Sequence, residues 1–515
     1  MNKHLKKIIL AVLTLGAVFI IATVSINIFL KNKLESFVNE RLPENMIRSY
    51  DEITVASFGG SLSITNASLI IKNKKDSVKH TFINVEKLKI SQISYWDYLF
   101  KDEIHIETIS LENPIMAYYK DRVLSSKDTV QKGIIDIYKP IIVNKLIVNN
   151  SRFAIYEKSE DSTKLYTKKL SVAIDDIKVD KNTVKRKIPL EFKSYRAKSD
   201  SVFVKVSPYE NVTVEDFSIV NNNALFEKVT LKTKYSKKKL SQVISTERDH
   251  YDLNLQTLKI EAIDFGFNQG QFFAKSKMVG LTAPTLEIYR DKLVSDDLKI
   301  KPLYSKMLRE LPFRLTVDSL KIKDGNIKYE ERTKSENMGG SINFRNLNAA
   351  ISNVSNTYNS PEKTNIKINA NFMDNTPISV DWSFDVNNKT DAFLFKANVD
   401  ALAANKLNSF TVPNLKVRLE GRTNKTYFTI DGNSEAATTD LKISYSNFKI
   451  NILQKDGKEK NTIFSAITNI FVSKNSKSDD NSFKEGTATA NRDKTKSIFN
   501  FLWISIKAAL VKIMV

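Results

Sequence analysis

Hydrophobic and polar residues alternate along most of the chain after Ile53. Successive side chains of a β-strand point to opposite faces, so a period of two predicts strands with one apolar face. One such series is Phe393, Phe395, Ala397 and Val399, and another is Leu415, Val417 and Leu419. Asp431-Gly432 marks an expected turn between later series. The pattern predicts a mostly β protein with an antiparallel meander over residues 346–472.

Helical spacing is confined to a few segments, of which the N-terminal one is the longest. Ile8 to Leu30 is an uncharged run that would be about 34 Å long as a helix, enough to cross a hydrocarbon layer of about 30 Å. It exceeds the 7–15 apolar residues typical of a cleaved signal peptide, which is the alternative interpretation. We therefore expect a cytoplasmic tip and transmembrane anchor over residues 1–30. An amphipathic stalk over residues 31–50 follows, with its helix broken at Pro43.

The charges that flank the apolar run predict how the chain is oriented. Lys3, Lys6 and Lys7 precede the run, and Lys31 and Lys33 follow it. The excess of cations on the first side favours a cytoplasmic N-terminus. We therefore expect a single-pass protein of a bacterial inner membrane with its bulk in the periplasm.

Four segments of the chain align with one another without gaps: ISLENPIMAYY, LIVNNSRFAIY, VGLTAPTLEIY and LKIKDGNIKYE. Each is expected to form a strand, a tight turn and a second strand. One apolar position of the repeat is occupied by Leu111, Val148, Leu281 and Ile322, and the next by Met116, Phe153, Leu286 and Ile327. The copies are irregularly spaced, which predicts a repeated unit on an elongated sheet and not a regular solenoid.

The last 43 residues combine a polar segment with an amphipathic one. Residues 473–496 are almost free of large apolar side chains, which predicts a flexible linker. Residues 497–515 have their polar positions on less than half of a helical wheel, which predicts a helix. We expect it to lie in a membrane interface, with Trp503, Lys507 and Lys512 near the headgroups. A second transmembrane span and burial against the β-domain are the alternatives.

Composition narrows the possible partners. The formal net charge is +21, but the cations are mostly lysines scattered along the chain, whereas nucleic-acid readers concentrate arginine in patches. Dispersed lysines are typical of soluble strand faces and protected sheet edges, so no nucleic-acid partner is expected. The chain has no cysteine, which excludes disulfides, thiol nucleophiles and zinc-thiolate sites.

No catalytic pattern is visible in the sequence. The four histidines, His4, His80, His105 and His250, are not paired at ligand spacing. The glycine-serine clusters at 59–61 and 339–341 match neither a nucleophile elbow nor a phosphate-binding loop. We expect neither an enzyme nor a cofactor.

After the anchor the chain continues with VEKLKISQIS (Val85 to Ser94), an expected short helix SYWDYLF and IHIETISLENPIMAYY (Ile104 to Tyr119), and the segment from Asp297 to Glu331 looks like the same module. This order of parts resembles the AsmA-like family of bacterial envelope proteins, relatives of the TamB group and of repeating β-groove lipid-transfer proteins. The resemblance implies an AsmA-like repeated β module over residues 51–345. The implied fold is an elongated, curved, groove-like antiparallel sheet with a few short helices.

The resemblance also implies a function in envelope or outer-membrane homeostasis, with phospholipid acyl chains held along the apolar face. A sheet with one apolar face must cover it with a second layer or leave it as a groove, so a closed core and a scaffold that binds other envelope proteins are the alternatives. The candidate groove residues are Leu111, Met116, Val148, Phe153, Leu281, Leu286, Ile322, Ile327, Phe393, Phe395, Val399, Leu415, Val417 and Leu419.

Overall fold

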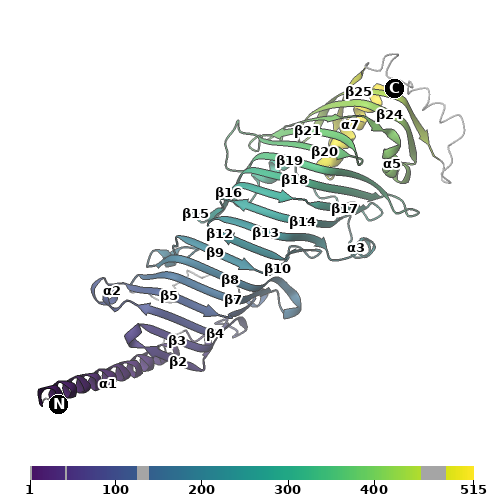
Figure 1. Ribbon diagram of the computed structural model, residues 1–515. Helices are drawn as coiled ribbons and strands as arrows, with labels where there is room; N and C mark the ends of the chain where they lie inside the picture. The colour runs from purple at the N-terminus through teal and green to yellow at the C-terminus, as the bar shows by residue number, and fades with distance from the viewer. Residues whose placement is uncertain (1–2, 41–42, 125–138, 454–482, 515) are drawn as a thin grey trace. The chain divides into compact units, whose positions relative to one another are not determined.

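The computed structural model describes residues 3–40, 43–124, 139–453 and 483–514. The protein is mostly β, with 57% of residues in strands and 18% in helices, as the alternation predicts (Figure 1). The chain divides into two compact units, one comprising residues 1–206 and 213–222 and the other 207–212 and 223–515. The expected module boundary at 345/346 falls inside a strand, β19 (Gly340–Ser355).

The first unit contains the long N-terminal helix and eleven of the strands. Its helices are α1 (Lys3–Glu40), η1 (Ser57–Gly59), α2 (Tyr95–Phe100), η2 (Lys120–Arg122), η3 (Glu160–Ser162) and η4 (Thr183–Lys185). Its strands are β1 (Met46–Ser49), β2 (Glu52–Ala56), β3 (Ser61–Lys72), β4 (Lys79–Ile93), β5 (Ile104–Glu112), β6 (Ile115–Tyr119), β7 (Ile141–Tyr156), β8 (Thr163–Val179), β9 (Ser194–Ser199), β10 (Ser201–Lys205) and β12 (Asp216–Val220). Neighbouring strands pair in the order β3, β4, β5 with β6, β7, β8 and β9.

In its described residues the second unit carries the remaining strands and four α-helices; β11 (Glu210–Val214) spans the division. The strands are β13 (Asn223–Thr233), β14 (Asp249–Glu261), β15 (Asp264–Asn268), β16 (Gln271–Thr282), β17 (Thr285–Asp291), β18 (Arg314–Arg332), β19, β20 (Thr364–Phe372), β21 (Thr376–Phe384), β22 (Phe393–Val399), β23 (Leu402–Ala403), β24 (Val417–Gly432), β25 (Ala436–Ile452) and β26 (Lys484–Asn491). The helices are α3 (Lys237–Val243), α4 (Tyr304–Arg309), η5 (Ala404–Leu407), α5 (Asn408–Leu415) and α7 (Ile498–Met514). From β18 to β22 the strands pair in chain order, and β24, β25 and β26 continue the sheet.

The helix α1 carries the predicted anchor. Among the described residues it is the one helix long and apolar enough to cross a membrane, over Leu13–Ser36, by length and composition, and none of that window is buried in the protein. The helix continues through the expected stalk as far as Glu40. The stalk is not helical throughout, because Met46–Ser49 form β1; Pro43, which cannot continue a helix, lies between the two elements.

The four repeat copies form two pairs, one in each unit, and the two copies of a pair run parallel on neighbouring strands. In the first unit β5 and β6 run parallel to β7, with Leu111 opposite Val148 and Met116 opposite Phe153. In the second unit β16 and β17 run parallel to β18, with Leu281 opposite Ile322 and Leu286 opposite Ile327. The gap-free alignment of the sequence is thus the register of the sheet. Other strand pairs, such as β18 with β19 and β24 with β25, are antiparallel, so the antiparallel sheet that we expected needs correction at these two places.

The prediction of a tight turn in each copy is wrong. Two copies lie within the single strands β7 and β18. The other two are interrupted at Asn113-Pro114 and Ala283-Pro284, yet the strand segments on either side pair with one common neighbour, β4 or β14. A positive-φ residue stands at the same repeat position in every copy: Asn113, Asn150, Ala283 and Asp324, with φ of 49°, 52°, 48° and 55°. The chain bends at this residue and continues in the same direction.

The C-terminal segment does not behave as a linker and membrane-surface helix. Part of the expected flexible linker forms β26, which pairs with β25; residues 473–482 lie outside the described residues. The predicted helix is present as α7, and it packs on the sheet (Figure 1). Burial against the β-domain, one of the alternatives, is therefore what the structure shows.

Tight packing explains why β26 lacks large apolar residues. Gly486 lies directly under α7, and a Cβ atom there would be 2.6 Å from Cγ1 of Ile513. On the half-buried side of the strand Gly486 is followed by Ala488 and Ala490. Small side chains let the helix approach the strand, and they leave no hydrophobic signal in the sequence.

Candidate functional site

The apolar positions of the repeat form ladders across the first unit. Ile106, Val143 and Ile177 on β5, β7 and β8 are buried, and they pack with half-buried neighbours that include Ile109 and Leu146. Leu111 and Val148 continue these strands one pleat further, and Met116 and Phe153 follow beyond the bend. All four candidate residues are half-buried. They pack against one another across strands, and part of each side chain stays accessible.

The spacing of these residues departs from a simple period of two. Ile106 and Ile109 are three residues apart and pack in one cluster, although an unbroken strand would point them to opposite faces. In the second unit Ile322 and Ile327 are five residues apart and pack against one cluster around Leu347. Two side chains an odd number of residues apart can point to the same face of the sheet only if the alternation of side chains is shifted by one residue between them. We call this shift a change of phase.

In the five-residue intervals of the repeat, positive-φ residues coincide with this change of phase. Asp324 lies between Ile322 and Ile327, and Asn113 and Asn150 lie at the equivalent place in the first unit. Because the repeat spacing is identical in all copies, Leu111 and Met116 lie on one face, as do Val148 and Phe153. The apolar face therefore continues past the bend in each unit.

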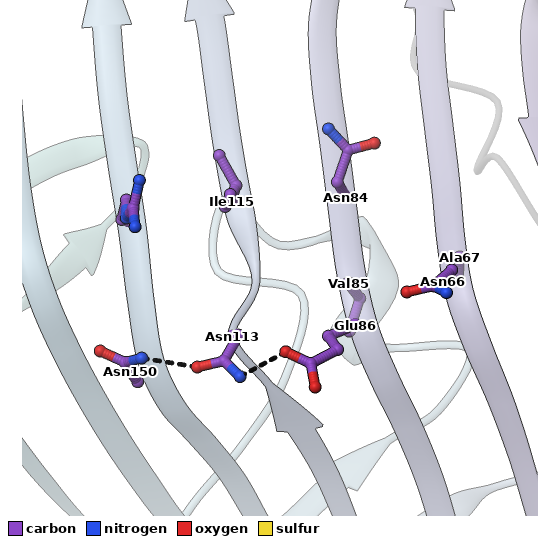
Figure 2. A pocket seen from close by; sticks show the side chains of 9 residues that line it. Asn66, Ala67, Asn84, Val85, Glu86, Asn113, Ile115 and Asn150 are labelled. Atoms are coloured by element: carbon purple, nitrogen blue, oxygen red, sulfur yellow. Dashed lines mark hydrogen bonds between the residues drawn. The ribbon is translucent and has the colours of Figure 1, made fainter.

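A row of polar side chains runs across the strands at the bend of the first unit. Figure 2 shows Asn150, Asn113 and Glu86 on neighbouring strands, with Asn66 on the next. The Asn150 amide donates to Oδ1 of Asn113 at 2.5 Å, and the Asn113 amide donates to Oε2 of Glu86 at 2.6 Å. Asparagine tolerates positive φ. These two hydrogen bonds link Asn150, Asn113 and Glu86 across neighbouring strands at the bend, whereas Asn66 donates to Asp51.

The candidate residues of the second unit divide into two environments. Leu281, Leu286, Ile322 and Ile327 are half-buried, like their counterparts in the first unit. Phe393 and Phe395, in contrast, belong to a closed core with Trp382, Ile430 and Phe501. Phe393 is only 5% exposed, and its ring centroid lies 6.1 Å from that of Phe501 on α7. An open groove at Phe393 is therefore wrong, because α7 covers it. Phe395 is half-buried and packs against Trp382 and Phe428 beside this core.

The other candidate residues of this region differ in outcome. Leu415 ends the helix α5 and is 51% exposed, so its assignment to a strand is wrong. Val417 and Leu419 do lie in β24, where Leu419 packs near Tyr445. Val399 is half-buried at the end of β22. Trp503, Lys507 and Lys512 lie on the exposed side of α7.

One cluster that the sequence analysis did not single out surrounds Asp97 on α2. Its carboxylate contacts Lys101 Nζ at 2.7 Å and His105 Nδ1 at 2.9 Å, and the other ring nitrogen of His105 contacts Asn144 Oδ1 at 2.9 Å. Hydrogen bonds from Lys101 and Ser94 lower the pKa of Asp97 to about 2. Asp97, Glu103 and His105 have ligand atoms close enough for a metal ion. The existing partners of Asp97 and His105 already account for their positions.

No protein-family model matches the chain, and no curated protein matches it either. The likeness to the AsmA-like family therefore rests on the sequence features themselves, and the function has to be argued from the geometry of the two units.

Proposed function

We propose that this chain is a single-pass protein of a bacterial inner membrane, with its bulk in the periplasm, that binds phospholipid acyl chains along the apolar face of its sheet. The proposal places it among AsmA-like envelope proteins that act in envelope or outer-membrane homeostasis. It includes no catalytic step and no cofactor.

The observation that carries the proposal is the contrast between two apolar surfaces. Where α7 covers the sheet, the side chains of Ile430 on β24 and Phe501 on α7 are 0% and 1% exposed. Leu111, Met116, Val148 and Phe153, in register on adjacent strands, stay half-buried. A row of accessible apolar side chains gains free energy when hydrocarbon covers it, at about 25 cal/mol per Å². An acyl chain is long and flexible, which suits a ladder that crosses several strands.

Membrane anchoring supports the same function. The apolar window of α1 is long enough to cross a bilayer and is not buried in the protein. A chain held at a bilayer by such a helix is close to a supply of phospholipid. The polar row at Asn113 and Asn150 lies at the bend without interrupting the apolar face.

Photocrosslinking in cells tests this proposal directly. A photoreactive phenylalanine analogue placed at Met116 or Phe153 should form adducts with phospholipid that mass spectrometry detects on the purified full-length chain. Ile115 is the matched control, because it neighbours Met116 on β6, is 43% exposed and points to the opposite face. We expect lipid adducts at Met116 and Phe153 and few at Ile115. Equal adducts at all three positions, or none, would contradict lipid binding by this face.

A protein-binding scaffold is the second candidate function. The closed core formed by β21, β22, β24 and α7 is the kind of packed layer that a scaffold has, and it offers no room for lipid. The same experiment separates the two functions, since a scaffold would give protein adducts at Met116 and Phe153 in place of lipid adducts.

A further inference from the structure

The short helix α2 presents an apolar face to the outside of the first unit. Trp96, Leu99 and Phe100 are 65%, 69% and 66% exposed. Their spacing of three and four residues places them on one side of the helix, and the rings of Trp96 and Phe100 are 4.2 Å apart between centroids. Large apolar side chains gathered in this way mark an interaction surface.

The opposite side of α2 is fixed to the sheet by polar contacts. Asp97 is 7% exposed and contacts Lys101 and His105, while its backbone N–H donates to Oγ of Ser94 at the start of the helix. The hydroxyl of Tyr95 donates to the backbone oxygen of Ser57 at 2.7 Å. The helix is thus held with its polar side inward and its apolar side outward.

The same contacts connect α2 with the membrane-spanning helix. Ser57 belongs to η1, and its backbone N–H donates to Oδ1 of Asn27 on α1 at 2.6 Å. The next residue, Phe58, is 80% exposed, and its ring meets that of Phe19 on α1 at 5.6 Å between centroids. The segment η1 therefore lies along α1, between the transmembrane helix and α2.

The position of Phe19 sets the depth of this contact. Phe19 is in the middle of the apolar run from Ile8 to Leu30. It lies 12 residues before Lys31, or about 18 Å along the helix axis. If α1 crosses the bilayer, the ring of Phe58 must lie within the hydrocarbon of one leaflet. That environment removes the cost of exposing Phe58 to water.

We infer that Phe58 and the apolar side of α2 insert into the bilayer leaflet next to α1. The partner is the lipid bilayer itself: acyl chains would cover Leu99 and Phe100, and Trp96 and Tyr98 suit the boundary with the headgroups. The ammonium of Lys139 lies 3.9 Å from the centre of the Tyr98 ring and 3.1 Å from the carboxylate of Asp102, which places charged groups beside Tyr98.

This insertion would place the N-terminal end of β5, and with it one end of the apolar face of the sheet, next to the membrane. The strand β5 follows α2 after three residues, and its first residue, Ile104, is half-buried and lies on the strand that leads to Leu111. Acyl chains could then pass from the leaflet to the ladder without crossing water. The inference rests on the membrane anchoring and lipid binding proposed above.

Site-directed spin labelling tests the insertion. Because the chain has no cysteine, a single cysteine accepts one nitroxide. The substitutions are Leu99→Cys, Phe58→Cys, Leu15→Cys and Val220→Cys, made singly in the full-length chain and reconstituted in vesicles of phosphatidylethanolamine and phosphatidylglycerol. Leu15 is 70% exposed on α1, and Val220 is 48% exposed on β12. Collisions with oxygen, which dissolves in hydrocarbon, are compared with collisions with a water-soluble nickel complex.

We expect oxygen collisions to dominate at positions 15, 58 and 99, and nickel collisions to dominate at position 220. Labels at 58 and 99 as accessible to nickel as the label at 220, with position 15 in hydrocarbon, would overturn the insertion and leave the anchoring intact. A label at position 15 that is accessible to nickel would overturn both. The lipid adducts at Met116 and Phe153 remain a separate readout of lipid binding.

Discussion

Single residues with positive φ decide which side chains share a face of this sheet. Asn113 and Asn150 stand between apolar positions that are five residues apart, and Asp324 does so in the second unit. Without a change of phase an odd interval would send Met116 and Phe153 to the opposite face. The residues that set the phase are therefore as important to the apolar ladder as its apolar members.

Replacing Asn113 should loosen the first unit in two separable ways. Asn113→Ala loses the hydrogen bonds to Glu86 and Asn150 and must keep an alanine at a φ of 49°, which adds about 1–2 kcal/mol. Asn113→Gly loses the same hydrogen bonds but tolerates this φ. Hydrogen exchange of the β5 and β7 amides should show a larger loss of protection for the alanine variant than for the glycine variant. Equal losses would show that the backbone conformation contributes nothing.

At the scale of elements, α7 converts an open apolar face into a core. Ile498, Phe501 and Leu502 pack against Trp382 and Phe393 from the sheet, and Ser505 and Ala509 are fully buried where the helix lies closest. The strands from β20 to β25 thus form one layer and α7 forms a second layer packed on it. Removing residues 497–515 should therefore expose the core of the second unit, which the removal of a helix that lay only in a membrane interface would not do.

Two phenylalanines of α7 provide a matched comparison. Phe501→Ala should lower the free energy of unfolding of the second unit by about 3–5 kcal/mol, because it leaves a cavity among buried side chains. Phe499→Ala, at a side chain that is 63% exposed, should change it by less than about 0.5 kcal/mol. Urea unfolding followed by hydrogen exchange of the β22 and β25 amides measures both. Similar effects of the two substitutions would mean that α7 does not hold this core.

At the scale of the whole molecule, the proposed function depends on where the chain lies relative to the membrane. The apolar window of α1 is of membrane-spanning length, and Lys3, Lys6 and Lys7 precede it. Cations are retained on the cytoplasmic side. The two β units should accordingly face the periplasm.

Labelling of single cysteines can measure this orientation. In cells with a permeabilised outer membrane, a maleimide that cannot cross the inner membrane should label Val220→Cys, whereas Lys3→Cys should react only after lysis. The unmodified chain, which has no cysteine, is the background control. The reverse pattern of labelling would place the N-terminus in the periplasm and refute the proposed topology.

The sequence by itself determined the features that depend on local pattern. An apolar run long enough for a bilayer predicts α1 whatever follows it, alternation predicts strands, and the gap-free repeat gave Leu111 and Val148, and likewise Leu281 and Ile322, equivalent positions. These signals are local because periodicity follows from the geometry of a single helix or strand.

The tertiary structure decided what covers each apolar face. An amphipathic pattern shows that a helix has an apolar side, but a membrane surface and a protein core satisfy that side equally well; contact with Trp382 and Phe393 decided it for α7. The strand β26 escaped prediction because Gly486 and its alanine neighbours pack closely without large side chains. Parallel pairing of the repeats joins residues 37 or more positions apart, a distance over which alternation carries no information.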